Sequence, residues 1–528
     1  MLHSALGYKG AFSAPNRLAS LAGQEVLARG STAIEAMVAA AATIAVVYPH
    51  MNGIGGDGFW IIHRPGQAPV GISACGQAAA LATPDWYAAR GHADAIPTRG
   101  GLAALTVPGS VGGWRAALAL VPEDRRMALA DLLAPAIGYA RDGFAVTGNQ
   151  SVCTSEKLAG LRDVPGFADA FLTNGAPPAA GSLLRQPALG ETLGALARDG
   201  LGTYYSGPIA KAHAACLEAN GSPLRLDDFQ NHATRTVTPL TVRTSLGQLY
   251  NMTAPTQGVS SLMILALFDR LGVTEAEGFD HLHGLIEATK QAFILRNRDL
   301  GDPESMAQDA QEWLADDLLG RLAARIDRKT ALAWPYTPVE GDTIWMGAAD
   351  KDGMVVSFIQ SVFWEFGSGL TCPETGVYFQ NRGAGFSLAA GPNQLAPGRR
   401  PFHTLNPALA HLNDGRVMAY GTMGGEGQPQ TQSAVFTRYA QFGQDLQLAV
   451  TQPRWLLGRT WGDVSTSLKL EDRFDPALVQ RMKDAGHQVE MIPPYSDLAG
   501  HAGAVVRHAS GLMESASDPR SDGAALSF

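Results

Sequence analysis

The stretch Thr343–Val362, TIWMGAADKDGMVVSFIQSV, carries the strongest local fold signal in the chain. Two runs rich in apolar and β-branched residues stand on either side of Asp350–Gly353. An Asp-Gly step between such runs is among the clearest signals for a β-hairpin. We therefore expect two antiparallel strands joined by a short turn.

The length of this turn decides which side chains face each other. If Asp350 pairs with Met354 across a three-residue loop, Thr343 lies opposite Ser361. Directly opposed residues share one face of the sheet, with Cβ atoms about 5 Å apart. A loop that differs by one residue would place Val362 there instead. The pattern predicts two hydroxyl groups at one strand end, which on this evidence alone are best interpreted as ordinary edge-strand hydroxyls.

The first part of the chain predicts a buried helix. Thr32–Glu35 has the pattern of a capping box, in which the Thr hydroxyl and the Glu carboxylate each satisfy a backbone N–H of the first turn. Ala36–Val47 is apolar nearly all round, as expected for a helix enclosed on most faces, and Pro49 ends it.

The glycine-rich segment Gly53–Gly58 comes next and contains the GxGxxG spacing of dinucleotide-binding folds. In those folds the glycines join a strand to a following helix, so that the helix N-terminus faces the pyrophosphate. Here the predicted helix precedes the glycines, and a strand-like run, Phe59–His63, follows them. We therefore expect these glycines to allow close packing of a helix end against a strand.

The rest of the chain indicates mixed layers. Asp131–Arg141 and His281–Arg298 have helical patterns, Ala331–Pro338 is typical of a linker, and β signals dominate after it. A chain of 528 residues forms either two domains or one large multilayer domain. The order of elements favours layers of helix and sheet over a simple βαβ series.

Charge and composition exclude several classes of partner. The chain has 40 basic and 49 acidic residues, a net charge of -9, and no cluster of Lys and Arg, so we expect neither a nucleic-acid nor an anionic-membrane partner. Its longest apolar run, Ala36–Tyr48, is too short to span a bilayer, and Met1–Tyr8 lacks the features of a signal peptide. The four cysteines lie far apart, which indicates a reduced compartment; they are Cys75, Cys153, Cys216 and Cys372. A soluble, cytoplasmic protein is expected.

No metal site is expected from the pattern of ligand-type residues. The 13 histidines include no HExxH motif, and His281-x-His283 has no carboxylate at ligand spacing.

Several motifs, in the same order along nearly the whole chain, resemble those of the gamma-glutamyltransferase family. The set that resembles the small-subunit signature is Gly341-Asp342-Thr343, Asp350–Gly353, Phe366–Gly369 and Gly424-Gly425. The others are Gly53–Gly58, Val107–Val111, Ala140–Phe144, Leu300–Pro303 and Ser517–Gly523. Each motif is weak alone, but together they are specific.

The resemblance implies an α+β fold, the four-layer αββα sandwich of N-terminal-nucleophile hydrolases. It also implies self-cleavage, in which the hydroxyl of Thr343 attacks the carbonyl of Asp342. The products would be a large segment, 1–342, and a small segment, 343–528. Both would form one intertwined unit and remain together as a heterodimer.

The resemblance also implies catalytic roles. A Thr hydroxyl is a weak nucleophile that needs a base, and the freed α-amine of Thr343, with an ordinary pKa of about 7.7–8.0, can supply it. Ser361 matches the residue that bonds this amine, in agreement with the hairpin register above. The backbone N–H groups of Gly424 and Gly425 match the oxyanion donors, which can be worth roughly 3–4 kcal/mol each. This mechanism needs no cofactor.

The substrate-binding positions depart from the family pattern. The family's Arg for the substrate α-carboxylate aligns with Cys75, and its Asp for the α-amino group aligns with Gly385. Arg382 replaces a Gln, and a pair of serines becomes His403 and Thr404. Losing an anion and gaining a cation reverses the charge preference at the acyl end, where Arg382 could hold a carboxylate in a bidentate manner.

A small acyl group with its own carboxylate is therefore expected: oxalyl, malonyl, succinyl or glutaryl, with oxamate as the smallest amide. The segment 387–401 is too short for the lid of some members, so water is the expected acceptor. The alternative interpretations are a structural ion pair for Arg382 and a core position for His403.

Three functions remain open at this point. The first is a self-processing amidohydrolase that hydrolyses the amide of a small carboxylate-bearing substrate, such as oxamate to oxalate and ammonia. The second is a gamma-glutamyl hydrolase or transpeptidase, or a glutaryl-type acylase. The third is an unprocessed, non-catalytic binding relative.

Overall fold

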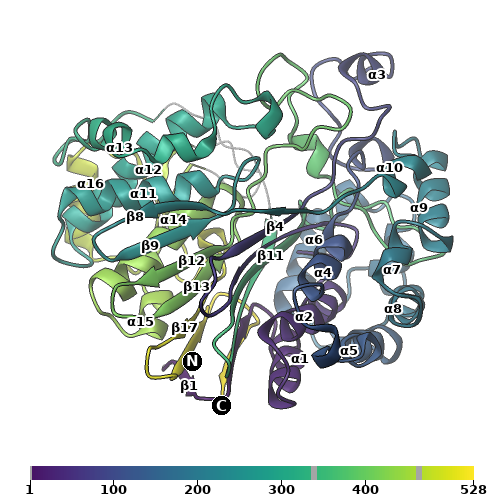
Figure 1. Cartoon of the computed structure of the whole chain (residues 1–528). Helices are drawn as coiled ribbons and strands as arrows, with labels where there is room; N and C mark the ends of the chain where they lie inside the picture. Colours follow the sequence, from purple (N-terminus) through teal and green to yellow (C-terminus); the bar gives the residue numbers. More distant parts are fainter. Residues whose placement is uncertain (1–2, 335–341, 459–465) are drawn as a thin grey trace.

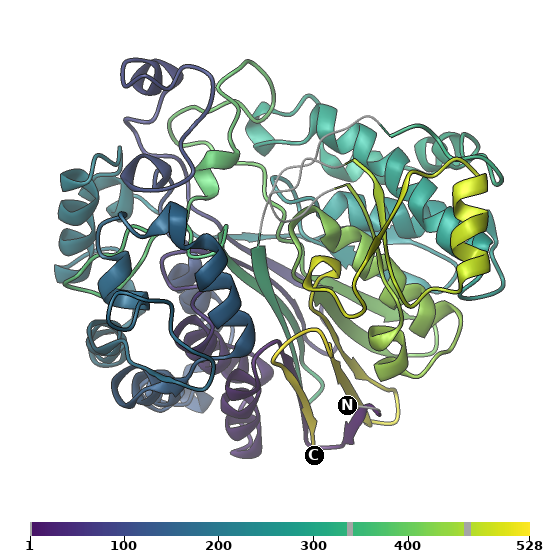
Figure 2. The ribbon, with the colours of Figure 1, turned by 180° about the vertical axis from the view of Figure 1, so that it is seen from behind.

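The computed structural model describes residues 3–334, 342–458 and 466–528. Two seven-stranded sheets pack face to face, and helices cover the outer face of each (Figure 1). This arrangement confirms the predicted α+β, four-layer architecture. The two marked chain ends lie at one end of the molecule (Figures 1 and 2), where the backbone N–H of Tyr8 donates to the carbonyl of Phe528 at 2.9 Å.

The predicted hairpin lies in the middle of one sheet, called here the β10 sheet. Its strands pair antiparallel throughout, in the order β19 (Ala524–Ser527), β2 (Gly10–Ala14), β10 (Asp342–Asp350), β11 (Val355–Phe363), β3 (Asp57–His63), β4 (Val70–Ala74) and β7 (Arg235–Val237).

The facing sheet, called here the β13 sheet, is also antiparallel throughout. Its order is β1 (Ala5–Gly7), β18 (Met513–Ser517), β17 (Ala502–Arg507), β13 (Val417–Thr422), β12 (Ala408–Leu412), β9 (Gly247–Asn251) and β8 (Leu240–Arg243). Smaller sheets are formed by β5 (Phe144–Ala145) with β6 (Leu183–Leu184), and by β14 (Trp455–Leu457), β15 (Leu468–Glu471) and β16 (Val489–Ile492).

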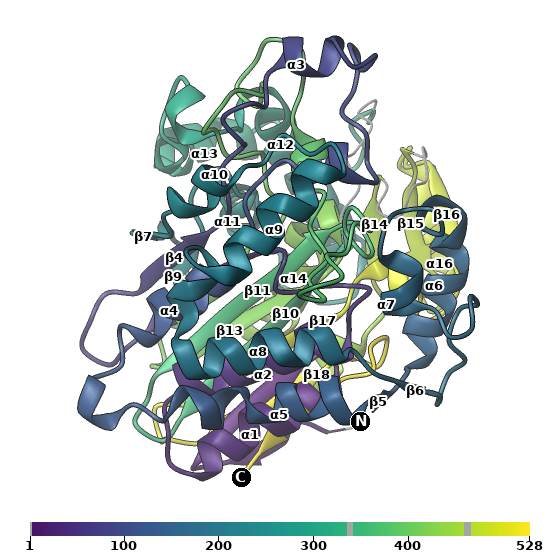
Figure 3. The same cartoon turned by 90° about the vertical axis from the view of Figure 1, so that its right-hand side faces the viewer.

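Helices from the first part of the chain cover the β10 sheet, and Figure 3 shows α2, α5 and α8 over its strands. The helices up to residue 230 are α1 (Arg17–Ala28), α2 (Ala33–Val47), α3 (Pro84–Ala88), α4 (Ser110–Leu118), α5 (Leu129–Asp142), α6 (Gly148–Leu161), α7 (Phe167–Phe171), α8 (Pro187–Asp199), α9 (Pro208–Ala219) and α10 (Leu226–Gln230).

The later helices lie on the side of the β13 sheet (Figure 1). They are α11 (Gly258–Leu271), α12 (Phe279–Asp299), α13 (Asp316–Ala323), α14 (Gln428–Phe436), α15 (Leu446–Thr451) and α16 (Pro476–Asp484). The predicted helices at 131–141 and 281–298 are thus confirmed as α5 and α12. The predicted linker at 331–338 has no helix or strand at 331–334, and its remainder lies outside the described residues.

Three buried clusters separate the four layers. Ile344 and Met346 of β10 belong to the core beneath α2 and α4, whereas Trp345 belongs to the core between the two sheets. A third core joins the β13 sheet to α11 and α12. Alternate side chains of β10 therefore enter two different cores, because successive residues of a strand point to opposite faces and both faces of β10 are buried.

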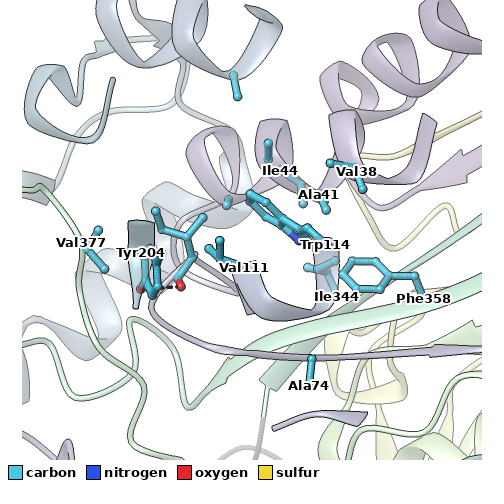
Figure 4. Close-up of a cluster of buried hydrophobic side chains, with 14 of the residues drawn as sticks. Val38, Ala41, Ile44, Ala74, Val111, Trp114, Tyr204, Ile344, Phe358 and Val377 are labelled. Atoms are coloured by element: carbon cyan, nitrogen blue, oxygen red, sulfur yellow. Dashed lines mark hydrogen bonds between the residues drawn. The ribbon is translucent and has the colours of Figure 1, made fainter. Parts of the chain in front are cut away.

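Helix α2 confirms the predicted cap and burial. The backbone N–H of Glu35 donates to the Thr32 hydroxyl at 3.3 Å, and the N–H of Thr32 donates to the Glu35 carboxylate at 3.0 Å. Every residue from Ala33 to Val47 is buried. Figure 4 shows Val38, Ala41 and Ile44 of α2 beside Trp114, Ile344 and Phe358, so small and branched side chains bring this helix close to the sheet.

The hairpin register is the predicted one, with one irregularity. The N–H of Asp350 donates to the carbonyl of Met354 at 3.1 Å, and the pairing continues from there to Ile344 opposite Gln360. It then shifts, because Asp342 pairs with Phe363. Two residues of β11, 361 and 362, thus lie opposite the single residue 343 of β10, which is the pattern of a β-bulge.

Candidate active site

Thr343 lies at the start of β10 and is fully buried. Because side chains alternate along a strand, Thr343 faces the same side as Trp345, toward the β13 sheet. Ser361, also buried, lies across the bulge, and its hydroxyl accepts a hydrogen bond from the N–H of Phe363 at 2.8 Å. The predicted pair of hydroxyl residues is therefore brought together between the sheets, away from any exposed edge.

The facing strand brings the predicted Gly424–Gly425 turn to Thr343. A Cβ atom on Gly421 or Gly503 would overlap the Trp345 indole, and these two glycines are paired in the β13 sheet. In the same way, Gly347 lies against Val505, so β17 runs in the same direction as β10. Because β13 is antiparallel to β17, it runs in the opposite direction. Continued for two more residues, this strand order places Thr343 level with the residue that precedes Gly424.

Both glycines of this turn have backbone angles that favour glycine: φ is 117° at Gly424 and 52° at Gly425. Within the described residues, neither backbone N–H donates a hydrogen bond. The Gln257 amide nitrogen donates to the carbonyls of Gly425 and Thr404, each at 2.8 Å, and thereby fixes the turn from behind. Thr404 thus contributes its backbone carbonyl to this arrangement.

A buried arginine holds Gln257 in place. Arg296 of α12 donates to the Gln257 side-chain oxygen at 2.7 Å and to the Glu426 carboxylate at 2.5 Å. Gln257, Arg296 and Glu426 were not predicted from the sequence, because their partners lie far away along the chain and no local motif marks them.

Asp57, the first residue of β3, is the central acceptor of the site. Its Oδ1 accepts from the backbone N–H groups of Gly76 and Gly109 and from the Gln380 amide, each at 3.0 Å. Burial raises the pKa of Asp57 to about 7, and these hydrogen bonds oppose the rise. Asp57 was not predicted as a site residue; the only local signal for it is an acidic residue within the glycine-rich segment.

The glycines before Asp57 allow this close approach, as predicted. A Cβ atom on Gly56 would overlap the carbonyl oxygen of Ser361, and one on Gly55 would overlap that of Tyr378. The glycine-rich segment after α2 therefore packs directly against β11.

His403 completes the contacts of Asp57. Its Nε2 lies 3.2 Å from Asp57 Oδ2, and its ring meets Phe59 edge to face. Burial, with a smaller contribution from Arg382, holds the pKa of His403 well below its usual range, so the ring is neutral. When Asp57 is ionised it can only accept, so His403 donates from Nε2, and Nδ1 remains an acceptor without a partner among the described residues.

Arg382 presents an unusual buried charge. Only 1% of its surface is exposed, and none of its three guanidinium nitrogens has a hydrogen-bond partner among the described residues. The guanidinium carbon lies 3.6 Å from the centroid of the Phe363 ring, so the group stacks on that ring. Burial lowers the pKa of Arg382 to about 9, against the attraction of Asp57. A hydrogen-bonded structural ion pair, the alternative interpretation, is therefore not what the described residues show.

The replacement at position 385 makes room for this side chain. A Cβ atom on Gly385 would overlap the Arg382 Nη2 atom. Cys75, the other replaced position, is fully buried, and burial raises the pKa of its thiol to about 12. Asp57 connects these positions, because it contacts His403 and interacts electrostatically with Arg382 and Cys75. The Phe363 ring beneath Arg382 belongs to the residue that pairs with Asp342.

Comparison with known proteins identifies the family of the chain. The profile described as gamma-glutamyltranspeptidase matches residues 19–528.

The chain belongs to the gamma-glutamyltranspeptidase family.

Two curated relatives and one solved structure show how this family member is placed. It is 52% identical over 520 residues to the oxamate amidohydrolase proenzyme of Klebsiella pneumoniae, covering 98% of each chain. It is 38% identical to the glutathione hydrolase-like YwrD proenzyme of Bacillus subtilis, covering 100% of each. Cephalosporin acylase from Bacillus halodurans superposes with a TM-score of 0.92 at 28% identity, covering 100% of this chain and 97% of that one.

These findings confirm the family and the enzyme class that the resemblance implied. This member of the gamma-glutamyltranspeptidase family is an amide hydrolase of the N-terminal-nucleophile type, and it is made as a proenzyme. Among the described residues, no helix has both the length and the apolar character needed to cross a bilayer.

One cluster differs from the expectation for ligand-type residues. Glu287 lies one turn after His283 on α12, and His487 joins them, with the candidate ligand atoms within 4.8 Å of one another. Lys290 donates to Glu287 at 2.6 Å, and the facing ring nitrogens of His283 and His487 are 2.9 Å apart. The expectation that no carboxylate accompanies these histidines is wrong, but the groups are paired with each other and with Lys290.

Proposed function

We propose that the chain cleaves itself between Asp342 and Thr343 and that Thr343 then serves as the catalytic nucleophile. The products are the segments 1–342 and 343–528, which remain associated as a heterodimer. The burial of Thr343 beside Ser361, at the start of a central strand, supports this assignment. So do the relatives named as proenzymes.

The reaction follows from the groups around Thr343. The free α-amine, held by Ser361, takes the hydroxyl proton, and the oxygen attacks the substrate amide carbon. The N–H groups of Gly424 and Gly425 stabilise the oxyanion. The amine then protonates the leaving nitrogen, ammonia departs, and a water molecule activated by the same amine hydrolyses the ester on Thr343.

The substrate is a small amide that carries its own carboxylate, with oxamate as the leading candidate. The single observation that carries this proposal is the buried Arg382 guanidinium, which has no hydrogen-bond partner among the described residues. A buried charge is costly unless an opposite charge pairs with it, and a carboxylate fits its planar fork. The 52% identity to a protein named oxamate amidohydrolase proenzyme supports the same substrate.

His403 and Thr404 line the same region as Arg382. The unprotonated Nδ1 of His403 can accept a hydrogen bond from the N–H of the substrate amide. The structure joins none of the four cysteines in a disulfide, which supports a reducing, cytoplasmic compartment.

The test compares the purified chain with Thr343→Ala and Thr343→Ser variants. Denaturing gels and intact-mass measurement follow cleavage, and ammonia release is measured with oxamate, malonamate, succinamate and glutaramate. We expect two fragments, one that ends at Asp342 and one that begins at Thr343. We also expect ammonia to be released fastest from oxamate. Thr343→Ala should stay intact and lose activity by roughly 10³-fold or more, whereas Thr343→Ser keeps the hydroxyl and should still be cleaved.

Other outcomes would reject parts of the proposal. An intact chain with full activity would overturn the nucleophile. Faster turnover of a gamma-glutamyl anilide than of any carboxylate-bearing amide would instead favour a gamma-glutamyl hydrolase, and a preference for glutaramate would favour a glutaryl-type acylase.

A further inference from the structure

Two of the four cysteines, far apart in the sequence, meet on the outer side of the helical layer. The Cys372 sulfur lies 3.8 Å from the carbonyl oxygen of Ala212 on α9. Cys216 follows Ala212 by one helical turn, and a helical side chain leans over the turn that precedes its own Cα. The Cys216 thiol therefore points to the place where the Cys372 sulfur lies, and each thiol shifts the pKa of the other.

The surroundings of Cys372 favour its thiolate. Besides Cys216, polar groups of the following turn stabilise the thiolate: the Thr375 hydroxyl and the backbone N–H groups of Thr375 and Glu374. Together they lower the pKa of Cys372 to about 6, with the Cys216 thiol as the largest cause. Thr375 is itself fixed, since its hydroxyl lies 3.1 Å from Nε2 of His213 on α9.

A small oxidant can reach this pair. Cys216 is half-buried at the surface of α9, and Cys372 lies on the wall of a cavity of about 170 Å³ that Arg185 also lines. Thiolate character and access are the two properties that make a cysteine susceptible to oxidation.

We propose that Cys216 and Cys372 form a reversible disulfide that links the 1–342 segment to the 343–528 segment. With hydrogen peroxide, the Cys372 thiolate attacks one oxygen, the O–O bond breaks, and a sulfenic acid and hydroxide result. The Cys216 sulfur then attacks the sulfenic sulfur and expels its oxygen as water. In total, two thiols lose two electrons and two protons while the peroxide becomes two waters, and a thiol reductant reverses the change.

The bond would act on the site through a short connection. Thr371 pairs with Tyr378, and the N–H of Phe379 donates to the carbonyl of Leu370 at 3.0 Å. This ladder leads from Cys372 directly to Gln380, which bonds Asp57, and then to Arg382. In a reducing compartment, a disulfide of this kind is transient and responds to oxidants.

The experiment uses the processed enzyme. It is treated with a small excess of hydrogen peroxide, blocked with N-ethylmaleimide, and run on a denaturing gel without reductant. We expect the two fragments to migrate as one band and to separate again with dithiothreitol. Cys216→Ser and Cys372→Ser should each remain as two bands, and Cys153→Ser, a matched control in the same layer, should behave as the parent. Two bands from the oxidised parent, or a single band from Cys216→Ser, would overturn the proposal.

The joining of fragments rests on the proposed cleavage, but the disulfide does not. Peptide mapping of the oxidised Thr343→Ala chain therefore tests the bond alone. A linked Cys216–Cys372 peptide with the mass of two hydrogens missing supports it, even if the parent is never cleaved. Absence of that peptide from the oxidised chain would overturn it, whatever the state of cleavage.

Discussion

Arg382 carries a positive charge into the protein interior, where water cannot solvate it. Its contact with the Phe363 ring supplies only part of the lost solvation, since a cation–π contact is worth about 0.5–2 kcal/mol. The rest must come from an anion at the guanidinium edge, which makes this residue the determinant of substrate charge in the proposed function.

Replacing Arg382 should therefore affect charged and neutral substrates differently. We expect Arg382→Ala to lower kcat/KM for oxamate by about 100-fold or more, because two charge-assisted hydrogen bonds are lost. Turnover of a neutral amide such as propionamide should change by no more than about 3-fold. Arg399→Ala, in the same segment but partly exposed, is the control. Equal losses on both substrates would show a structural role instead.

Among single site residues, those that belong to motifs could be predicted from the sequence. Those that only the fold brings together could not. Arg382, Gly385 and His403 stand in recognisable segments, so their departure from the family pattern was visible. Asp57 gains its importance from Gln380 and His403, which are more than 300 residues away. No local pattern encodes that contact.

At the scale of elements, local chemistry predicted most of what the structure contains. The capping box at Thr32 and the Asp-Gly turn at Asp352 specify a helix start and a hairpin register through nearby atoms alone. The bulge opposite Thr343 was not predicted, because no local pattern marks the extra residue; there the Ser361 carbonyl lies against Gly56, which directly precedes β3.

Helix α12 also holds the chain at Leu332, which precedes the proposed cleavage site in the sequence. Lys290 donates to the Leu332 carbonyl at 2.6 Å, and the N–H of Leu332 donates to the Glu287 carboxylate at 3.1 Å. The side chains of Lys290 and Glu287 are each 2% exposed, so they form a buried ion pair that binds both backbone groups of Leu332.

Breaking this ion pair should destabilise the protein strongly. We expect Lys290→Met, made in the uncleaved Thr343→Ala chain, to lower the free energy of unfolding by about 3–5 kcal/mol, because it leaves the Glu287 carboxylate buried and unpaired. Adding Glu287→Gln should recover part of the loss. Thermal unfolding gives the order of Tm values; a double variant less stable than Lys290→Met would contradict the ion-pair explanation.

At the scale of the molecule, the two proposed segments are interleaved strand by strand. In the β10 sheet, β10 and β11 of the second segment lie between β2 and β3 of the first. In the β13 sheet, β12 of the second segment pairs with β9 of the first. Each sheet therefore depends on backbone hydrogen bonds between the segments.

The cleaved protein should accordingly behave as a single particle. We expect both fragments to elute together in size-exclusion chromatography in native buffer, even after extensive dilution, and to separate only in denaturant. The uncleaved Thr343→Ala chain provides the reference elution volume. Dissociation into two folded fragments in native buffer would contradict the strand order.

The central position of β10 has a consequence for how such a molecule is made. A strand enclosed by neighbours from another polypeptide would have to find its slot by collision, competing with aggregation of its own unpaired edges. While the Asp342–Thr343 bond is intact, the partner is always present at the high effective concentration of a tether. Under the proposed cleavage, the bond would assist assembly first and become dispensable afterwards, so translating the halves from separate genes would forfeit that advantage.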